Sequence, residues 1–262
     1  MKRATLVIQD INRLSQNTEF IPTGFKILDE ELDGGLMRKE LIVLGGYTGS
    51  GKSYIAGQML LAGAKKGFKS AYYSLEISNE MIVSRLIGGE ANIKPSRIMA
   101  GLLTEKEKEL KEKAQAHITA YNGLMAFEDS LYKLEELKKS IQENEFDFVI
   151  IDFVQNILAK GSEYETMSMS SIEFQKLAKT CNCCIMVLSQ LSNDAFNTGK
   201  LEYKGSGSIA TVCDLGMFLV KNQDEPNKLK LVVKKNRRGR SGIEINLISS
   251  FPGGKIYENN RD

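Results

Sequence analysis

The sequence predicts a mixed α/β fold whose β-sheet is largely parallel and ends in antiparallel strands. From Glu19 onward, short apolar segments alternate with segments of helical pattern, which is typical of a parallel sheet covered by helices on both faces. The glycine-rich residues 46–53 lie where the first apolar segment passes into the first long helical segment. After residue 214, three apolar segments follow one another with only turns between them, which indicates antiparallel strands at the end of the chain.

The expected elements follow from local composition and period. Strands are expected at the short apolar segments, which are residues 41–44, 70–75, 124–127, 146–153, 184–189, 215–220, 229–233 and 243–248. Helices are expected at residues 3–15, 52–66, 79–86, 104–120, 134–144 and 170–180. Thr104 with Glu107 three residues later forms the capping-box pattern at the start of one of them. Residues 3–15 carry an apolar stripe, which predicts an amphipathic helix that needs a partner on its own core or on a neighbouring copy.

Length and composition are those of a soluble globular protein. The chain has 262 residues, of which 42% are hydrophobic and 26% charged, so it suits one α/β domain with an extension, or two small domains. No apolar segment approaches the ~20 residues that a membrane-spanning helix needs, and the charged N-terminus does not resemble a secretory signal. Four cysteines without a secretory feature indicate a reducing compartment, so we expect a cytoplasmic protein with no membrane partner.

The cysteines favour buried thiols over a zinc site. Cys181, Cys183 and Cys184 crowd together just before an apolar segment, and Cys213 lies far along the chain. Zinc sites usually pair two Cys-x-x-Cys elements. A single distant cysteine is a poor second half, so we expect thiols packed at the edge of a strand.

Charge alone gives no strong indication of nucleic-acid binding, because the net charge is only +2. One segment departs from this balance. Residues 228–240 contain seven lysines and arginines and no acidic residue. A solvated basic face is the simplest explanation of such a run, but its position downstream of the nucleotide motifs favours a functional role.

The most specific motif is a phosphate-binding P-loop, Gly-x-x-x-x-Gly-Lys-Ser, between a strand and a helix. Its residues are Gly46, Tyr47, Thr48, Gly49, Ser50, Gly51, Lys52 and Ser53. The glycines let backbone amides close around phosphate oxygens, and the helix N-terminus adds partial positive charge. We expect Lys52 to reach the β- and γ-phosphates and the Ser53 hydroxyl to bind magnesium. The motif therefore predicts ATP and Mg²⁺ as cofactors, and a chance flexible loop is a much weaker explanation.

Two carboxylates complete the expected hydrolytic site. Asp152 ends the apolar segment Phe148 to Ile151, which is the Walker B arrangement downstream of a P-loop, and we expect it to hold magnesium through water. A turn aspartate at a strand end is the alternative explanation. Glu76 follows the first strand after the P-loop helix, where its carboxylate can serve as general base near the γ-phosphate. A glutamate at a strand end is more often simply solvated.

Several strings in order along the chain resemble motifs of the DnaB-family replicative DNA helicases. Ser74-Leu75-Glu76-Ile77-Ser78 resembles the family's Ser-Leu-Glu-Met-Ser, and Ile151-Asp152-Phe153-Val154-Gln155 resembles its Ile-Asp-Tyr-Leu-Gln. Further matches are Ile21-Pro22-Thr23-Gly24-Phe25, Leu188-Ser189-Gln190-Leu191-Ser192, Gly205-Ser206-Gly207-Ser208-Ile209 with Asp214, and Lys235-Asn236-Arg237-x-Gly239. Together they cover nearly the whole chain from residue 21 to about 242 and are highly specific, although each string alone is weak evidence.

The resemblance implies a RecA-like P-loop core at residues 19–262, preceded by a linker helix at residues 1–18. It implies that Glu76 is the catalytic base and that Gln190 links the γ-phosphate to DNA-facing loops. Lys235 and Arg237 are expected to reach the ATP of the adjacent subunit in a homo-hexamer, with Arg237 as the arginine finger. Lys204, Gly205, Ser206 and Gly207 are expected to grip single-stranded DNA in the central channel. Primase and a helicase loader are the further partners that the family implies.

The chain also departs from the family, and a second function stays open. Family members carry an N-terminal domain that contacts primase, and nothing here resembles it, so a fragment and a phage-type protein without that domain are both open. Residues 161–170 are expected to form a loop that is acidic where relatives tend to be basic and DNA-facing, which weakens the expectation of DNA contact there. The alternative to a motor is a RecA- or clock-type ATPase that uses ATP for assembly or DNA binding without processive unwinding.

Overall fold

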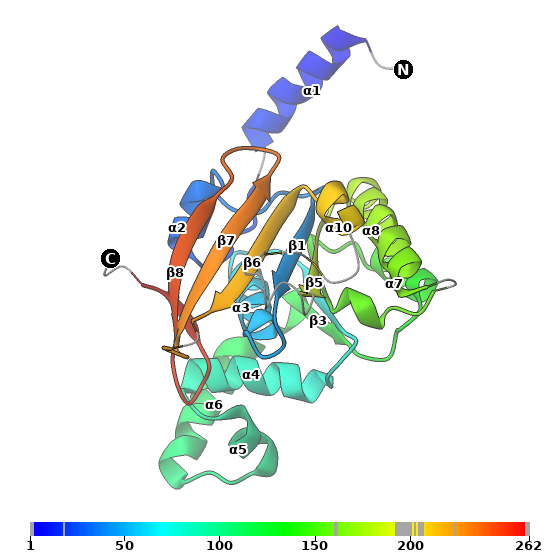
Figure 1. The fold of residues 1–262 in the computed structure, drawn as a ribbon. Coiled ribbons are helices and arrows are strands. Elements are labelled where there is room, and N and C mark those ends of the chain that lie inside the picture. Colours follow the sequence, from blue (N-terminus) through cyan, green and yellow to red (C-terminus); the bar gives the residue numbers. More distant parts are fainter. Residues whose placement is uncertain are drawn as a thin grey trace.

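A computed structural model describes residues 3–17, 19–159, 162–191, 201, 203, 207–222 and 224–259. Its centre is a nine-stranded sheet with the order β3-β2-β4-β5-β1-β6-β7-β8-β9 (Figure 1). The strands are β1 (Leu41–Gly46), β2 (Ser70–Ser74), β3 (Met125–Glu128), β4 (Phe148–Asp152), β5 (Cys184–Gln190), β6 (Leu215–Lys221), β7 (Lys228–Asn236), β8 (Ile243–Ser249) and β9 (Ile256–Glu258).

The pairing confirms the predicted change from parallel to antiparallel strands. The strands from β3 through β6 in the sheet pair in parallel, and β7, β8 and β9 pair antiparallel to their neighbours. Strand β1 lies in the middle of the sheet between β5 and β6. The carboxyl ends of β1, β2, β4 and β5 therefore meet at one edge, where open α/β sheets bind their ligands.

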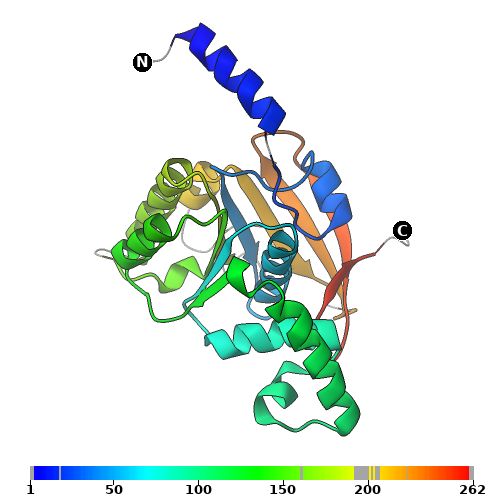
Figure 2. The ribbon, with the colours of Figure 1, turned by 180° about the vertical axis from the view of Figure 1, so that it is seen from behind.

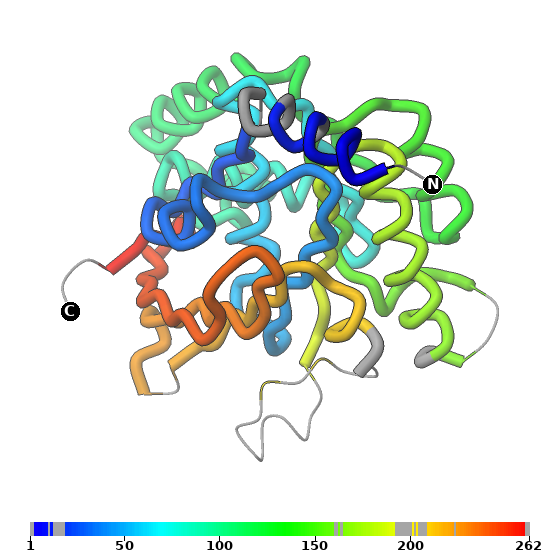
Figure 3. The backbone as a smooth tube through the Cα atoms, turned by 90° about the horizontal axis from the view of Figure 1, so that it is seen from above, coloured from blue at the N-terminus to red at the C-terminus, as the bar shows by residue number. Residues whose placement is uncertain are grey.

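Helices cover both faces of the sheet, as Figures 2 and 3 show from behind and from above. One buried cluster joins the sheet to α2 and α3, and a second joins the opposite face to α7, α8 and α10. The helices are α1 (Ala4–Asn17), α2 (Lys26–Glu31), α3 (Lys52–Lys65), α4 (Asn79–Ala91), α5 (Pro95–Ala100), α6 (Glu105–Thr119), α7 (Leu134–Asn144), α8 (Glu163–Thr180) and α10 (Gly207–Val212). Short 3-10 turns occupy Asn122–Leu124 and Val154–Asn156.

Helices α4, α5 and α6 form a small helical layer at one end of the sheet (Figure 1). The side chains of Leu86, Ile98 and Ile118 bury one another in a third cluster. The predicted capping box of α6 is present, because the Thr104 side chain accepts from the Glu107 amide and the Glu107 carboxylate accepts from the Thr104 amide. Helix α5 was not predicted, since its six residues are too few to show a helical period.

The N-terminal helix is present and lies away from the sheet (Figure 1). Its apolar side chains Leu6, Ile8 and Ile11 are 50%, 57% and 56% exposed. The amphipathic stripe therefore has little contact with the core of its own chain. The division into a linker helix at residues 1–18 and a domain at 19–262 stays a prediction.

The interpretation of residues 161–170 as a loop was wrong for most of that segment. Helix α8 begins at Glu163, and Ser162 and Glu165 form a capping box at its start. The serine-rich first turns have weak helix propensity, but Met167 is buried in the core cluster that contains the sheet. Tertiary packing thus overrides local propensity here, and Glu165 serves as a capping residue.

Three of the cysteines are buried, as the sequence predicts. Cys183, Cys184 and Cys213 are fully buried, and Cys181 is partly exposed. Burial raises the pKa of Cys183 to about 12 and that of Cys213 to about 11, so both stay protonated at neutral pH. Within the described ranges, no helix is long and apolar enough to span a membrane.

Candidate nucleotide-binding site

The glycine-rich loop connects the carboxyl end of β1 to the first turn of α3. Gly49 and Gly51 have φ angles of +75° and +100°, a region that side chains other than glycine rarely adopt. A Cβ atom at Gly46 would lie 2.6 Å from the Ser50 hydroxyl oxygen and 2.9 Å from the Leu219 carbonyl oxygen. These glycines let the loop turn tightly and leave its backbone amides open to a ligand.

Lys52 begins α3, and its side chain folds along the loop. Its ammonium donates to the carbonyl oxygens of Gly46 at 2.8 Å and Tyr47 at 2.9 Å. Burial lowers the pKa of Lys52, and the carboxylates of Asp152 and Glu76 counteract that decrease. The positive charge of the loop therefore lies within the field of the two predicted carboxylates.

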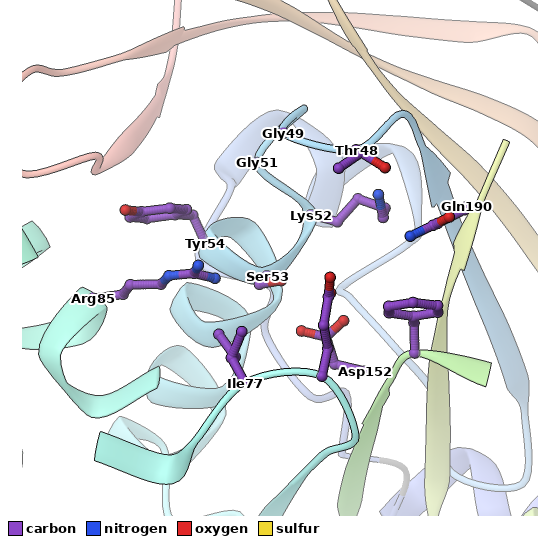
Figure 4. A pocket seen from close by; sticks show the side chains of 12 residues that line it. Thr48, Gly49, Gly51, Lys52, Ser53, Tyr54, Ile77, Arg85, Asp152 and Gln190 are labelled. Carbon is purple, nitrogen blue, oxygen red and sulfur yellow. The ribbon is translucent and has the colours of Figure 1, made fainter. Parts of the chain in front are cut away.

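Asp152 ends β4 and is only 2% exposed. Figure 4 shows Lys52, Ser53 and Asp152 converging on the same pocket. The Tyr72 hydroxyl of β2 donates to Asp152 Oδ2 at 2.6 Å. The aspartate is thus a buried side chain held by a hydrogen bond.

Glu76, just after β2, and Gln190, the last residue of β5, also line this pocket. Glu76 lies just beyond β2, where the Leu75 amide donates to the Asp152 carbonyl oxygen at 2.6 Å. The Asn156 side chain donates to the Leu75 carbonyl oxygen at 2.8 Å, which ties the segment to the end of β4. Gln190 ends β5 and lies across the pocket from Tyr54 and Arg85 (Figure 4). The sheet therefore brings five predicted side chains together from four adjacent elements.

Arg85 and Tyr54 also line the pocket, and neither was predicted from the sequence as a site residue. Arg85 lies on α4 with its guanidinium carbon 4.9 Å from the centroid of the Tyr54 ring. Among the described residues, this guanidinium has no carboxylate within ion-pair distance. The sequence gives little indication of a role for Arg85, because it is a single arginine in the second turn of the helix that follows Glu76.

Lys235 and Arg237 do not reach the P-loop pocket of their own chain. The Lys235 ammonium donates to the Ala210 and Thr211 carbonyl oxygens at 2.8 Å each. The Arg237 guanidinium pairs with Asp214 at 2.8 Å and donates to the Thr211 carbonyl oxygen at 3.1 Å. Both side chains therefore lie at the carboxyl end of α10, and Arg237 is still 47% exposed.

The basic segment 228–240 is less uniform than its sequence indicates. Arg238 pairs with Glu40 at 2.9 Å and donates to the carbonyl oxygens of Leu32 and Gly35. Lys230 pairs with Glu244 across two strands. Several of these charges thus stabilise the fold, and the segment is not one continuous basic face.

The structure leaves the predicted DNA-contacting residues largely untested. Lys204, Gly205 and Ser206 lie outside the described residues, and Gly207 begins α10. Just before them, the Tyr203 ring stacks on Phe218 with 4.4 Å between ring centroids. Tyr203 therefore packs on β6, the strand next to β1 in the sheet.

The central parallel sheet, the antiparallel end and the P-loop pocket define a RecA-like P-loop nucleotide-binding domain. Residues 20–250 match the DnaB-like helicase C terminal domain family. The chain belongs to this family.

Comparison with single proteins agrees with this membership. Over 243 residues the chain is 28% identical to the replicative DNA helicase DnaB of Treponema pallidum. The aligned region covers 88% of this chain and 55% of that helicase. Its fold is similar to a solved ATPase domain, with a TM-score of 0.84, 20% identity, and coverage of 98% of this chain and 97% of that one. It is also similar to a DnaB-like replicative helicase whose interactions with primase were studied, with a TM-score of 0.83, 19% identity, and coverage of 97% and 65%.

These findings confirm the family and the RecA-like fold and favour the helicase over the assembly-type ATPase. The chain spans about half the length of the T. pallidum helicase, 55% of it. At about one-fifth identity, the two solved structures bear on the fold alone.

Proposed function

We propose that this chain is the motor domain of a replicative DNA helicase, which hydrolyses ATP with magnesium to move along single-stranded DNA as a homo-hexamer. One observation carries the proposal. The P-loop lysine, the two carboxylates and Gln190 line a single pocket in a chain of the DnaB-like family.

The pocket fits a magnesium-bound nucleoside triphosphate. The turn at Gly46 leaves no room for a Cβ atom, and the Ser50 hydroxyl is buried without a hydrogen-bond partner among the described residues. Lys52 would hold the β- and γ-phosphates, and Ser53 and Asp152 would hold the metal. Bound magnesium would neutralise charge on the phosphates. Protein side chains would activate the water and stabilise the remaining negative charge.

Glu76 is the general base in this proposal. Its carboxylate faces the same pocket as Lys52, where it can accept a proton from water that attacks the terminal phosphate. Arg85 lines the same pocket with no carboxylate partner in the described chain. A guanidinium there can stabilise negative charge on the nucleotide.

A neighbouring subunit would complete the site with Lys235 and Arg237. Neither side chain lines its own pocket, and Arg237 is 47% exposed, so it can serve a different copy. An arginine finger stabilises charge as it develops on the transferred phosphoryl group. Hydrolysis at each interface would therefore depend on assembly into a ring.

Contact with DNA is assigned to Lys204, Gly205, Ser206 and Gly207. Backbone amides and one lysine suit a grip on phosphates that does not read bases. Primase and a loader are proposed partners of the whole protein by family likeness, and one similar helicase was studied with primase. A cytoplasmic location is proposed with them.

Single-stranded DNA should stimulate ATP hydrolysis by the assembled ring. A motor couples its steps to the strand, so its turnover responds to DNA, whereas an assembly ATPase need not respond. The measurement is the steady-state ATPase rate of a size-defined oligomer with and without single-stranded DNA. Equal rates would count against the motor and in favour of the assembly-type ATPase.

Replacing Arg85 with methionine should lower kcat by about 10- to 100-fold, because it removes the positive charge that we expect to contact the bound nucleotide. Methionine keeps part of the packing against Tyr54. Arg97→Met is the matched control, since Arg97 pairs with Glu107 far from the pocket on α5. The same kinetics in both variants would rule out a role for Arg85 in the site.

A further inference from the structure

Two adjacent buried tyrosines on β2 point to opposite faces of the sheet. Tyr72 is 0% exposed and Tyr73 is 2% exposed. Tyr72 packs in the cluster that contains α3, whereas Tyr73 packs in the cluster of α7 and α8. The Tyr73 hydroxyl lies 2.8 Å from Ser140 Oγ. This alternation is that of any strand, but of the two hydroxyls it is that of Tyr72 that contacts Asp152, a residue that lines the nucleotide pocket.

The sheet register places Tyr72 beside Asp152. Tyr72 pairs with Ile150 and Ser74 pairs with Asp152, so Tyr72 and Asp152 are diagonal neighbours on one face. A long side chain reaches across such a diagonal. The Tyr72 hydroxyl donates to Asp152 Oδ2 at 2.6 Å, a length typical of a hydrogen bond to a carboxylate.

This contact holds the Asp152 carboxylate in one orientation. One lone pair of Oδ2 accepts from the phenol, so Oδ1 and the second lone pair of Oδ2 remain available to a ligand. The phenol therefore contacts a side chain proposed as a metal ligand, while Tyr72 itself is not among the residues that line the pocket.

We propose that Tyr72 is a positioning residue for the metal site, which orients the Asp152 carboxylate toward the cation. The inference rests on the proposed function, since it assumes that Asp152 helps to hold the magnesium of ATP. Loss of a residue that orients a metal ligand typically lowers metal affinity by about 10- to 100-fold.

The test compares Tyr72→Phe with Tyr73→Phe, because each removes one hydroxyl from a buried tyrosine of the same strand. Mn²⁺ is the probe, and its affinity is titrated by electron paramagnetic resonance in the presence of saturating ADP. Tyr72→Phe should weaken Mn²⁺ binding at least about 10-fold, and Tyr73→Phe should leave it within about twofold of the unchanged protein. ADP binding in the presence of EDTA should be the same in all three proteins, because the P-loop holds the phosphates.

The outcomes separate this inference from the proposed function. Unchanged Mn²⁺ affinity in Tyr72→Phe, or an equal loss in Tyr73→Phe, would overturn the role of Tyr72 and leave the nucleotide site intact. Failure of the unchanged protein to bind ADP or Mn²⁺ would instead remove the proposed function, and the inference with it.

A second comparison covers the case in which Tyr72→Phe does not fold. Tyr72→Phe leaves the buried Asp152 carboxylate without its hydrogen-bond donor, which lowers the stability of the fold. Asp152→Asn removes the negative charge, so the loss of the donor destabilises the protein less. If Tyr72 acts through Asp152, adding Tyr72→Phe to Asp152→Asn should change Mn²⁺ affinity no further. A further drop of about 10-fold in the double variant would contradict the inference.

Discussion

Replacing Lys52 with alanine should reduce ATP hydrolysis by at least about 100-fold, which is the usual effect of removing one preorganised group that stabilises transition-state charge. The ammonium is buried within the P-loop, held by the carbonyl oxygens of Gly46 and Tyr47. Burial already lowers the pKa of Lys52, and only the nearby carboxylates counteract this. Bound phosphates would add to that stabilisation of the charged form, so the lysine is suited to a polyanion.

The matched control is Lys65→Ala, because Lys65 lies exposed in the last turn of the same helix. Steady-state ATPase rates and ADP affinity should be measured for both variants, with thermal unfolding as the check on folding. We expect loss of turnover only in Lys52→Ala. Turnover close to that of the unchanged protein would mean that the P-loop does not bind the hydrolysed nucleotide.

The parts of the site that could be predicted from sequence are those that depend on neighbours along the chain. The P-loop from Gly46 to Ser53 needs only a strand, a turn with positive φ angles and a helix start, and these leave a local pattern. The apolar strand that ends in Asp152 is similarly local. The alternation of strands and helices predicted the sheet and its antiparallel end for the same reason.

The missed residues depend on which strands lie side by side. Tyr72 reaches Asp152 only because β2 pairs with β4, and 80 residues separate the two side chains in sequence. Arg85 reaches the pocket only because α4 packs beside α3. Neither position has a spacing that local period could reveal, and both tyrosines of β2 read simply as strand residues.

The error at residues 161–170 has a different physical cause. The loop was expected from the place of this segment in the family, but burial of Met167 in the core cluster stabilises the first turns of α8. The Ser171 hydroxyl donates to the Met167 carbonyl oxygen within the helix at 2.7 Å. Small polar side chains can satisfy themselves on helical carbonyls in this way, so packing decides the conformation.

Replacing Arg237 with alanine should reduce ATP hydrolysis by about 10³- to 10⁵-fold in the assembled ring, as loss of an arginine finger does. The side chain is placed for such a role in a neighbour. It lies at the end of β7, does not line its own pocket, and is 47% exposed despite its contacts with Asp214 and Thr211. Arg240→Ala is the control, since Arg240 is an exposed residue of the same turn.

Mixing two inactive variants tests whether the finger acts between subunits. Arg237→Ala keeps the base Glu76, and Glu76→Ala keeps the finger, so an interface that joins one of each in the right order is complete. Random assembly of equal amounts forms such an interface about one time in four, because a head-to-tail ring interface uses a different surface from each partner. The mixture should therefore recover part of the ATPase rate, while either variant alone stays inactive. If rings shown to contain both variants recover nothing, Arg237 does not act on the pocket of its neighbour. If Arg237→Ala alone hydrolyses ATP normally, the side chain serves only to hold α10 through Asp214 and Thr211.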